Sequence, residues 1–396
     1  MVVARCGLDP TGSFERVLPF AQVADIQRVF SSEAMSWPQI KWVVLDKLLA
    51  SPSRSGIPDL PAASPPDSVA FLQFTSGSTS EPKGVMITHN NLAHNLSLIV
   101  HELGATTDTV VVSWLPQYVS REREGQIGYK LAPRPSCSRC SRESADVDVI
   151  HVTSGRPPRL FVSSSTRYHD MGLIGSYLGA LYCGGCGYYM SPFAFIKNPS
   201  VWVESISKYR ATHMQAPNFA YTLCARKFST MRTPPTLDLS CVRHMINAAE
   251  PVDEQAIDAF VAVFTPHGLP AGVIFPTYGL AEHTVFVCSG GSQRLLIDKV
   301  ALEREQRVVL VDGSGGSTAS LTAMMIGCGY PFRGDGVDVA IVEDDVRLEE
   351  DHVGEIWVHS PSKAAGYWNL PEQSREDFEG SLKADAEKCS AGERKW

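Results

Sequence analysis

The middle of the chain is a succession of short apolar runs and longer amphipathic stretches. Runs of four to six mostly apolar residues, typical of buried strands, lie at 69–74, 85–88, 109–114 and 272–275. The segments 212–216 and 242–247 are also interpreted as strands. Apolar residues recur at helical spacing in 89–104, 171–182, 199–210, 218–227 and 253–264. Strands that alternate with helices predict an α/β fold class, with a doubly wound and mostly parallel sheet.

A different pattern follows residue 289. The segments 337–342 and 353–359 alternate polar and apolar residues and are interpreted as the strands of a hairpin. We therefore predict a smaller β-rich subdomain after the α/β core. The predicted division is a partial N-terminal segment and linker (1–67), a core (68–288), the β-rich subdomain (289–385) and an unstructured tail (386–396).

Composition and charge exclude several classes of function. The chain has 396 residues and a formal net charge of -8, with no dense block of Lys and Arg, which argues against a nucleic-acid partner. No apolar run reaches the roughly 20 residues of a membrane span. The start lacks a secretion signal, and ten cysteines are scattered along the chain, so we predict a cytoplasmic protein. Two Cys-x-x-Cys pairs, Cys137/Cys140 and Cys183/Cys186, are too far apart in sequence to favour zinc.

The stretch 75–84 carries the clearest chemistry. It places hydroxyl side chains, two glycines and a lysine between two predicted strands. Glycine lets the backbone approach an anion, amides and hydroxyls donate to its oxygens, and lysine compensates the charge, so the stretch suits a triphosphate. A flexible Ser/Gly turn is the simpler alternative. The stretch is not a Walker loop, because no Gly-Lys-Ser/Thr opens a helix here.

This loop resembles the phosphate-binding loop of the adenylate-forming enzymes. A second match strengthens the resemblance: Thr-Tyr-Gly-Leu-Ala-Glu at 277–282 looks like the adenine and magnesium motif of that family. The run 247–252 looks like its second adenine-contacting turn. Within the family the chain is most similar to fatty acyl-AMP ligases, because of the run Tyr-His-Asp-Met-Gly-Leu-Ile-Gly at 168–175, the Leu-Ala-Glu ending, the long connector 288–329 and the segment 354–368.

The resemblance implies a set of site residues and cofactors. ATP and Mg²⁺ would be bound, with Glu282 holding the metal and His169 beside the acyl carboxylate and the α-phosphate. Lys83, His169 and Glu282 would be the catalytic residues. The phosphates would lie against Thr75, Ser76, Gly77, Ser78, Thr79 and Lys83, and the adenosine against Ala249, Glu250, Pro251, Thr277, Tyr278 and Gly279. Simpler roles remain open, such as a helix-opening glutamate for Glu282 and a core tyrosine for Tyr278.

The implied reaction is the ATP-dependent activation of a fatty acid, or another carboxylic acid, to an acyl-adenylate with release of pyrophosphate. The connector indicates transfer to the phosphopantetheine of an acyl carrier protein, or of a polyketide or peptide synthase. An acyl-CoA synthetase and a catalytically dead nucleotide- or acyl-binding module are the alternatives.

Two departures from the family pattern bear on activity. Residues 118–167 carry arginines, serines and prolines without periodicity, and they separate two halves that are contiguous in the family. We interpret them as a retained intron, since codons for Gln117 and Arg167 can form splice sites, or as a disordered insertion. The resemblance also implies a mobile C-terminal domain with a catalytic lysine, which we expect this sequence to lack. We therefore expect weak or no adenylation by this chain.

Overall fold

A computed structural model describes residues 64–75, 83–115, 170–311, 321–332 and 336–383 of the chain. It also gives the backbone of two short parallel strands, β1 (Phe14–Arg16) and β2 (Ile40–Trp42). The predictions for the insertion 118–167 and the tail 386–396 fall outside the described residues, and so do those for most of segment 1–67.

A five-stranded parallel sheet forms the centre of the described fold. Its order is β6 (Cys186–Tyr189), β5 (Val110–Ser113), β7 (His213–Pro217), β8 (His244–Ala248) and β9 (Ile274–Pro276). Every neighbouring pair in this sheet is parallel. The strand order reverses at β5, because β6 lies on one side of it and β7 to β9 lie on the other. Such a switch point opens a crevice at the carboxyl ends of the strands, where ligands bind in folds of this kind.

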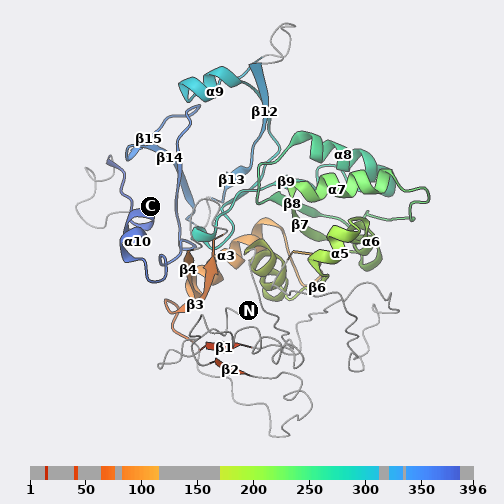
Figure 1. The fold of residues 1–396 in the computed structure, drawn as a ribbon, viewed down its shortest axis with the longest axis horizontal. Coiled ribbons are helices and arrows are strands. Elements are labelled where there is room, and N and C mark those ends of the chain that lie inside the picture. The colour runs from red at the N-terminus through yellow and green to blue at the C-terminus, as the bar shows by residue number, and fades with distance from the viewer. Residues whose placement is uncertain are drawn as a thin grey trace, which may run out of the picture.

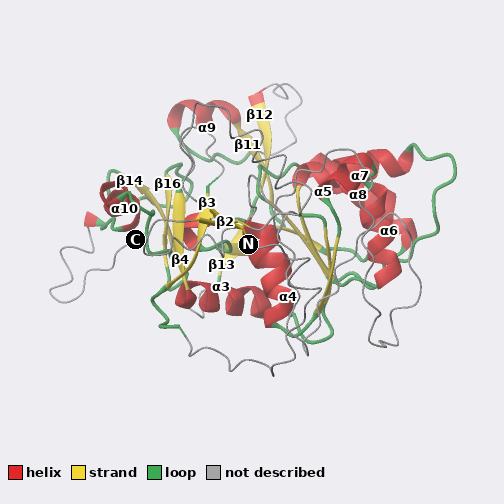
Figure 2. Ribbon diagram, turned by 60° about the horizontal axis from the view of Figure 1, so that its bottom comes forward, coloured by secondary structure: helices red, strands yellow, loops and turns green. Residues whose placement is uncertain are grey.

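Helices cover both faces of the sheet, as predicted (Figure 2). One face carries α5 (Pro192–Lys197), α6 (Ser200–Tyr209), α7 (Asn218–Ser229) and α8 (Glu254–Phe264). The other carries α3 (His89–Glu102) and α4 (Gly179–Tyr182). Trp202, Tyr221 and Phe260 are fully buried on the first face and pack edge to face or tilted. The doubly wound α/β prediction is confirmed.

The predicted helix 171–182 has an unexpected geometry. Its first part, Met171–Leu178, is a π-helix, and α4 continues it directly. A β-carbon on Gly175 would lie 2.5 Å from the side-chain oxygen of Gln215 on β7, so glycine is what allows this close approach to the sheet. Apolar periodicity alone does not distinguish a π-helix from an α-helix, and π-turns occur frequently at functional sites.

The predicted loop 75–84 joins two antiparallel strands, β3 (Val69–Phe74) and β4 (Gly84–Thr88). A segment far along the chain lies against the other edge of β4: Trp368 N–H donates to the Gly84 carbonyl at 2.8 Å, and Met86 N–H donates to the Gly366 carbonyl at 2.8 Å. After β4, Thr88 and Asn91 form a capping box that begins α3. The hairpin is therefore fixed on both sides.

Antiparallel strands make up the part after residue 288 (Figure 1). They pair as β10 (Cys288–Gly290) with β13 (Gly329–Pro331), and β11 (Arg294–Asp298) with β12 (Thr322–Ile326). The third sheet has the order β15 (Val346–Arg347), β14 (Asp338–Glu343), β16 (Glu355–His359). Two helices, α9 (Lys299–Glu305) and α10 (Pro371–Phe378), accompany them. The β-rich region and the pairing of its two predicted strands are confirmed, whereas the domain boundaries stay predictions.

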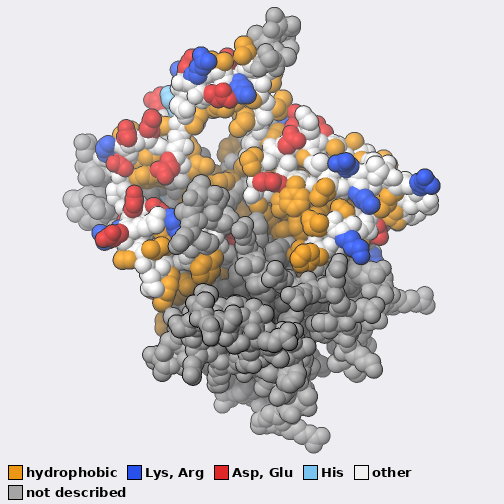
Figure 3. Space-filling model, in the orientation of Figure 1, with side chains coloured by type: hydrophobic (Ala, Val, Ile, Leu, Met, Phe, Trp, Pro, Cys, Tyr) orange, Lys and Arg blue, Asp and Glu red, His pale blue; other side chains and the backbone are white. Residues whose placement is uncertain are grey.

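The described surface is unevenly charged. Acidic side chains gather over the part that holds β14, β15 and α10 (Figure 3), and acidic residues outnumber basic ones there. Among the described residues, no helix has the length and apolar character needed to cross a membrane.

Candidate nucleotide-binding site

The predicted adenosine contacts lie together at one edge of the parallel sheet. Residues 249–251 follow β8 directly and residues 277–279 follow β9, and these two strands are neighbours. Thr277 N–H donates to the Asn247 carbonyl at 3.0 Å, so the two turns begin at the same level. Both therefore reach the carboxyl edge of the sheet, the edge at which ligands bind in open α/β sheets.

The turn after β8 has an unusual backbone. Ala249 is exposed and has a φ of 70°, a left-handed conformation that a residue with a side chain rarely adopts. The Glu250 carboxylate accepts a hydrogen bond of 2.6 Å from Phe219 N–H in the first turn of α7, which suits the positive end of that helix. The side chain of Glu250 therefore supports α7, and the exposed backbone around Ala249 is what the turn offers to a ligand.

The turn after β9 is clamped by hydrogen bonds. Tyr278 and Cys288 exchange two backbone hydrogen bonds of 3.1 Å each. Burial raises the pKa of the half-buried Tyr278 phenol, which therefore stays neutral. Gly279 is exposed on one side, but a β-carbon there would lie 1.8 Å from the Val285 carbonyl oxygen. Only glycine fits at this position, and this fixes the path of the chain towards Glu282.

The predicted phosphate loop is closed at its base. Thr75 N–H donates to the Lys83 carbonyl at 3.0 Å, and Lys83 N–H donates to the Thr75 hydroxyl at 3.1 Å. The predicted contacts Ser76, Gly77, Ser78 and Thr79 lie outside the described residues, as does His169. The described residue next to His169 is Asp170, whose carboxylate accepts from Met171 N–H at 2.8 Å and begins the π-helix.

Lys83 and Glu282 are brought together by a tyrosine. The Tyr367 hydroxyl donates to Glu282 Oε1 at 2.8 Å, and Lys83 Nζ lies over the Tyr367 ring, 4.6 Å from its centroid. Lys83 Nζ is also 3.6 Å from Asp377 Oδ2 on α10. Burial, together with the adjacent Glu282 carboxylate, raises the pKa of the Tyr367 phenol, so this hydroxyl stays a hydrogen-bond donor. The Lys83 ammonium therefore lies over the face of the buried Tyr367 ring, and the Glu282 carboxylate lies at its hydroxyl.

A buried polar network holds the backbone that carries Glu282. The fully buried Asn95 on α3 donates to the Phe286 carbonyl at 2.9 Å and accepts from Phe286 N–H at 3.1 Å. His283 bonds the Phe286 carbonyl through Nδ1 at 2.9 Å, and the Ser360 hydroxyl through Nε2. Glu282 therefore stands on a short 3₁₀-helix, Ala281–His283, that α3 and the segment after β16 both support.

This network makes stability depend on pH. Burial lowers the pKa of His283 to about 4, whereas an unfolded histidine titrates near 6.5. Between these two values the unfolded chain binds a proton that the folded chain does not, so the free energy of unfolding falls as the pH falls. From pH 7 to pH 4 we expect a loss of about 3 kcal/mol from His283, measured by urea unfolding. The free energy of unfolding of the variant His283→Gln should depend less on pH than that of the wild type. If it depends equally on pH in both proteins, His283 is not the group responsible.

An unpaired acceptor lies at the same sheet edge. The side-chain oxygen of the fully buried Asn247, at the end of β8, finds no donor among the described residues, although its amide nitrogen donates to Asn218 at 3.0 Å. A buried acceptor without a partner is costly, and a ligand that carries an amino group would satisfy it.

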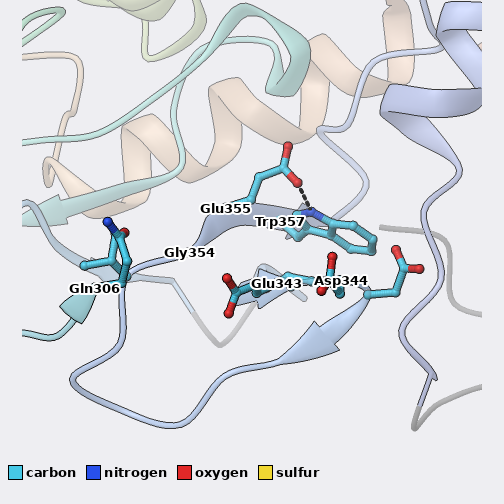
Figure 4. A pocket seen from close by; sticks show the side chains of 9 residues that line it. Gln306, Glu343, Asp344, Gly354, Glu355 and Trp357 are labelled. Atoms are coloured by element: carbon cyan, nitrogen blue, oxygen red, sulfur yellow. Dashed lines mark hydrogen bonds between the residues drawn. The ribbon is translucent and has the colours of Figure 1, made fainter. Parts of the chain in front are cut away.

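The larger of two described pockets lies elsewhere, in the β-rich region (Figure 4). It has about 530 Å³ and is lined by Gln306, Trp357 and the acidic residues Glu343, Asp344, Asp345 and Glu355, among others. Trp357 Nε1 donates to Glu355, two residues away on β16, at 2.9 Å (Figure 4). Its carboxylates would repel a triphosphate, so it is not the candidate nucleotide site.

The described fold is an α/β fold, with the candidate residues at the carboxyl ends of parallel strands. The chain belongs to the AMP-binding enzyme family, whose model matches residues 14–126 and 145–368. It is therefore a member of the adenylate-forming ligases, and the predicted resemblance to fatty acyl-AMP ligases is confirmed by its relatives.

Two relatives and one solved structure show the similarity. The chain is 33% identical over 374 residues to the medium-chain-fatty-acid–[acyl-carrier-protein] ligase JamA of Moorena producens, which covers 93% of this chain and 53% of that protein. It is 29% identical over 325 residues to the long-chain-fatty-acid–AMP ligase FadD32 of Mycolicibacterium smegmatis, and the match covers 80% of this chain and 42% of that protein. The fatty acyl-adenylate ligase of L. pneumophila, solved with acyl adenylate and pyrophosphate, superposes with a TM-score of 0.69 at 28% identity. The superposition covers 96% of this chain and 55% of that one. The chain thus spans about half the length of these relatives.

Sequence reasoning missed three contributors to the site. Tyr367 lay in the segment 354–368 that carries part of the resemblance, but nothing in the pattern gave it a role. Asp377 lies on a polar helix that resembles any exposed helix, and Asn95 is one polar residue in an amphipathic pattern. Only the contacts across the fold identify them.

Proposed function

We propose that the chain forms the ATP and acyl sites of a cytoplasmic enzyme that joins a fatty acid to AMP and releases pyrophosphate. The acyl group would then pass to the phosphopantetheine of a carrier protein. The observation that carries this proposal is the meeting of Lys83 and Glu282 at Tyr367, since it sets the phosphate loop next to the proposed metal ligand.

The residues fit Mg²⁺ and ATP. Magnesium prefers carboxylate and phosphate oxygens, and Glu282 offers an anionic oxygen beside the lysine of the phosphate loop. The unpaired Asn247 oxygen, at the end of β8, would be an acceptor for an amino group such as that of adenine. We assign Glu282 to the metal, the loop from Thr75 to Lys83 to the phosphates, and the two turns to the adenosine. When bound, Mg²⁺ would offset the charge of the phosphates.

The work of the chain's own residues is positioning and charge compensation. Attack of a carboxylate oxygen on the α-phosphorus needs the two reactants held in line and the departing pyrophosphate neutralised. Lys83 supplies a fixed positive charge at the base of the loop, and the clamped turn at Tyr278 limits where the nucleotide can lie. His169 would orient the acyl carboxylate.

Two relatives support the substrate and acceptor. JamA and a similar protein from Teredinibacter turnerae, TtuA, are both named medium-chain-fatty-acid–[acyl-carrier-protein] ligases. We therefore propose a medium-chain fatty acid as substrate and an acyl carrier protein, or a carrier domain of a polyketide or peptide synthase, as acceptor.

The test is the product formed from α-labelled ATP, Mg²⁺ and dodecanoate. We expect little adenylate from the chain as it stands. When the C-terminal domain of a relative is joined to it, we expect a labelled acyl-adenylate that requires both the acid and the metal, and transfer of the acyl group to a phosphopantetheinylated carrier domain. Binding of ATP without any adenylate, even with that domain joined, would overturn the proposal in favour of a catalytically dead nucleotide-binding module.

A CoA-forming ligase is the second candidate, because FadD21 of Mycobacterium tuberculosis, 31% identical over 357 residues, is named a putative fatty-acid–CoA ligase. Adding CoA in place of the carrier to the same reaction distinguishes the two. Accumulation of the CoA thioester would favour the CoA ligase, and release of free acyl-adenylate would favour the carrier route.

A further inference from the structure

We propose that Tyr367 is a positioning residue that orients both Lys83 of the phosphate loop and the proposed metal ligand Glu282. In this proposal Asp377 forms an ion pair with Lys83 until a phosphate of the ligand replaces it. This inference rests on the proposed function, because it takes Glu282 as the metal ligand and Lys83 as a phosphate contact. Tyr367 touches neither ATP nor the acid in this role; it acts through the two residues beside it.

Tyr367 is held from several directions. Its side chain is 4% exposed and packs against Phe378 with ring centroids 5.0 Å apart at 82°. Its backbone N–H donates to the Ser374 hydroxyl at 2.8 Å, and the residue bridges to Val85 on β4. The backbone contacts to β4 and α10 and the packing of the ring hold this side chain in place, so its hydroxyl and its ring face are positioned together.

The two ends of this side chain contact different parts of the proposed site. The hydroxyl donates to Glu282 at 2.8 Å, and the ring face receives the Lys83 ammonium at 4.6 Å from the centroid. A hydrogen bond to a metal-binding carboxylate fixes its orientation, and loss of such a partner typically lowers metal affinity about 10–100-fold. The face of an aromatic ring attracts a cation although the ring itself carries no charge, so the ring can fix the position of the lysine ammonium. Tyr367 therefore sets both the position of the carboxylate and the direction of the lysine.

Asp377 gives the lysine a counter-charge from the protein itself. Its Oδ2 lies 3.6 Å from Lys83 Nζ, and both side chains are partly exposed, at 35% and 22%. Such a pair is weak, so an incoming phosphate can replace it. The lysine is thus kept near the ring by a carboxylate that competes with the ligand.

The experiment is calorimetric titration of the full chain with ATP, once with Mg²⁺ and once with EDTA. Tyr367→Phe removes only the hydroxyl, so we expect MgATP to bind about 10-fold more weakly and metal-free ATP to bind as in the wild type. Tyr367→Leu also removes the ring, so both forms should bind more weakly. Asp377→Asn should strengthen metal-free ATP binding about 2-fold, since Lys83 loses its competitor.

A matched control is Tyr221→Phe, because that buried tyrosine also donates its hydroxyl, to the Ile246 carbonyl at 2.8 Å. Its melting temperature should fall while the ratio of MgATP to ATP affinity stays unchanged. If Tyr367→Phe behaves like this control, Tyr367 is merely structural and the inference is wrong, although the proposed function stands. If the wild-type chain binds neither form of ATP, the proposed function is wrong and the inference falls with it.

Discussion

Replacing Glu282 with glutamine should lower acyl-adenylate formation by about 10²–10³-fold, the cost of losing one main electrostatic contact in an active site. Glutamine has nearly the same size, and its carbonyl oxygen can still accept from the Tyr367 hydroxyl, which now donates at 2.8 Å. The change therefore removes charge and leaves the packing intact. Magnesium prefers an anionic oxygen, so the residual activity should need a higher Mg²⁺ concentration. Pyrophosphate exchange across a series of Mg²⁺ concentrations measures both effects.

The control for this substitution is Glu254→Gln on α8. Glu254 is also a partly exposed glutamate, and it forms an ion pair with Arg294 on β11, so its loss should leave the Mg²⁺ dependence unchanged. Stability should change by only about 0.5 kcal/mol, as for most surface ion pairs. Wild-type activity and Mg²⁺ dependence in Glu282→Gln would remove Glu282 from the proposed metal site.

Replacing Gly279 with alanine should destabilise the folded chain by about 3 kcal/mol and abolish MgATP binding. The added β-carbon would lie 1.8 Å from the Val285 carbonyl oxygen and 2.9 Å from its carbon, and both atoms belong to the backbone. Backbone atoms do not move aside as a flexible side chain does, so the turn from Thr277 to Val285 must shift, and overpacking of this kind costs a few kcal/mol. That turn carries Tyr278 and Glu282. Urea unfolding and MgATP titration measure the two losses.

Gly179→Ala is the matched control. Its β-carbon would make only an ordinary contact, 3.5 Å from the Ile174 carbonyl oxygen, at the start of α4. Alanine favours a helix over glycine by about 1 kcal/mol, so this variant should be as stable as the wild type or more so. If Gly279→Ala retained both wild-type stability and MgATP affinity, the turn would be more tolerant than its contacts indicate.

The α/β core could be predicted largely from the sequence. The run at 109–114 holds three successive valines, which is the pattern of a strand covered on both sides, and it is β5 in the structure. The segments 212–216 and 242–247 mix apolar with polar residues, and they are β7 and β8. The helices end within about two residues of their predicted limits, since Gly104 and Asp253 are strong end and start signals. The short strands β10 to β13 were not predicted, because they have partly exposed faces and little alternation.

The candidate site was predicted through motifs and not through geometry. The loop 75–84 and the run 277–282 each have residues suited to phosphate and metal, and family resemblance gave them their roles. Which residues meet was not predictable, because Tyr367 contacts Lys83 and Glu282 only after the segment 364–368 pairs with β4. Such pairing depends on backbone hydrogen bonds that carry no residue-specific signal.

The sequence by itself determined the fold class, the hairpin that presents the phosphate loop, and the type of chemistry, because burial patterns and a dense motif are local properties. Tertiary structure alone decided that Lys83 and Glu282 both contact the buried Tyr367 and that Asp377 on α10 lies 3.6 Å from Lys83. It also decided that Asn95 and His283 both bond to the backbone of Phe286. These contacts join segments far apart in the chain, and only the packing of the core brings those segments together.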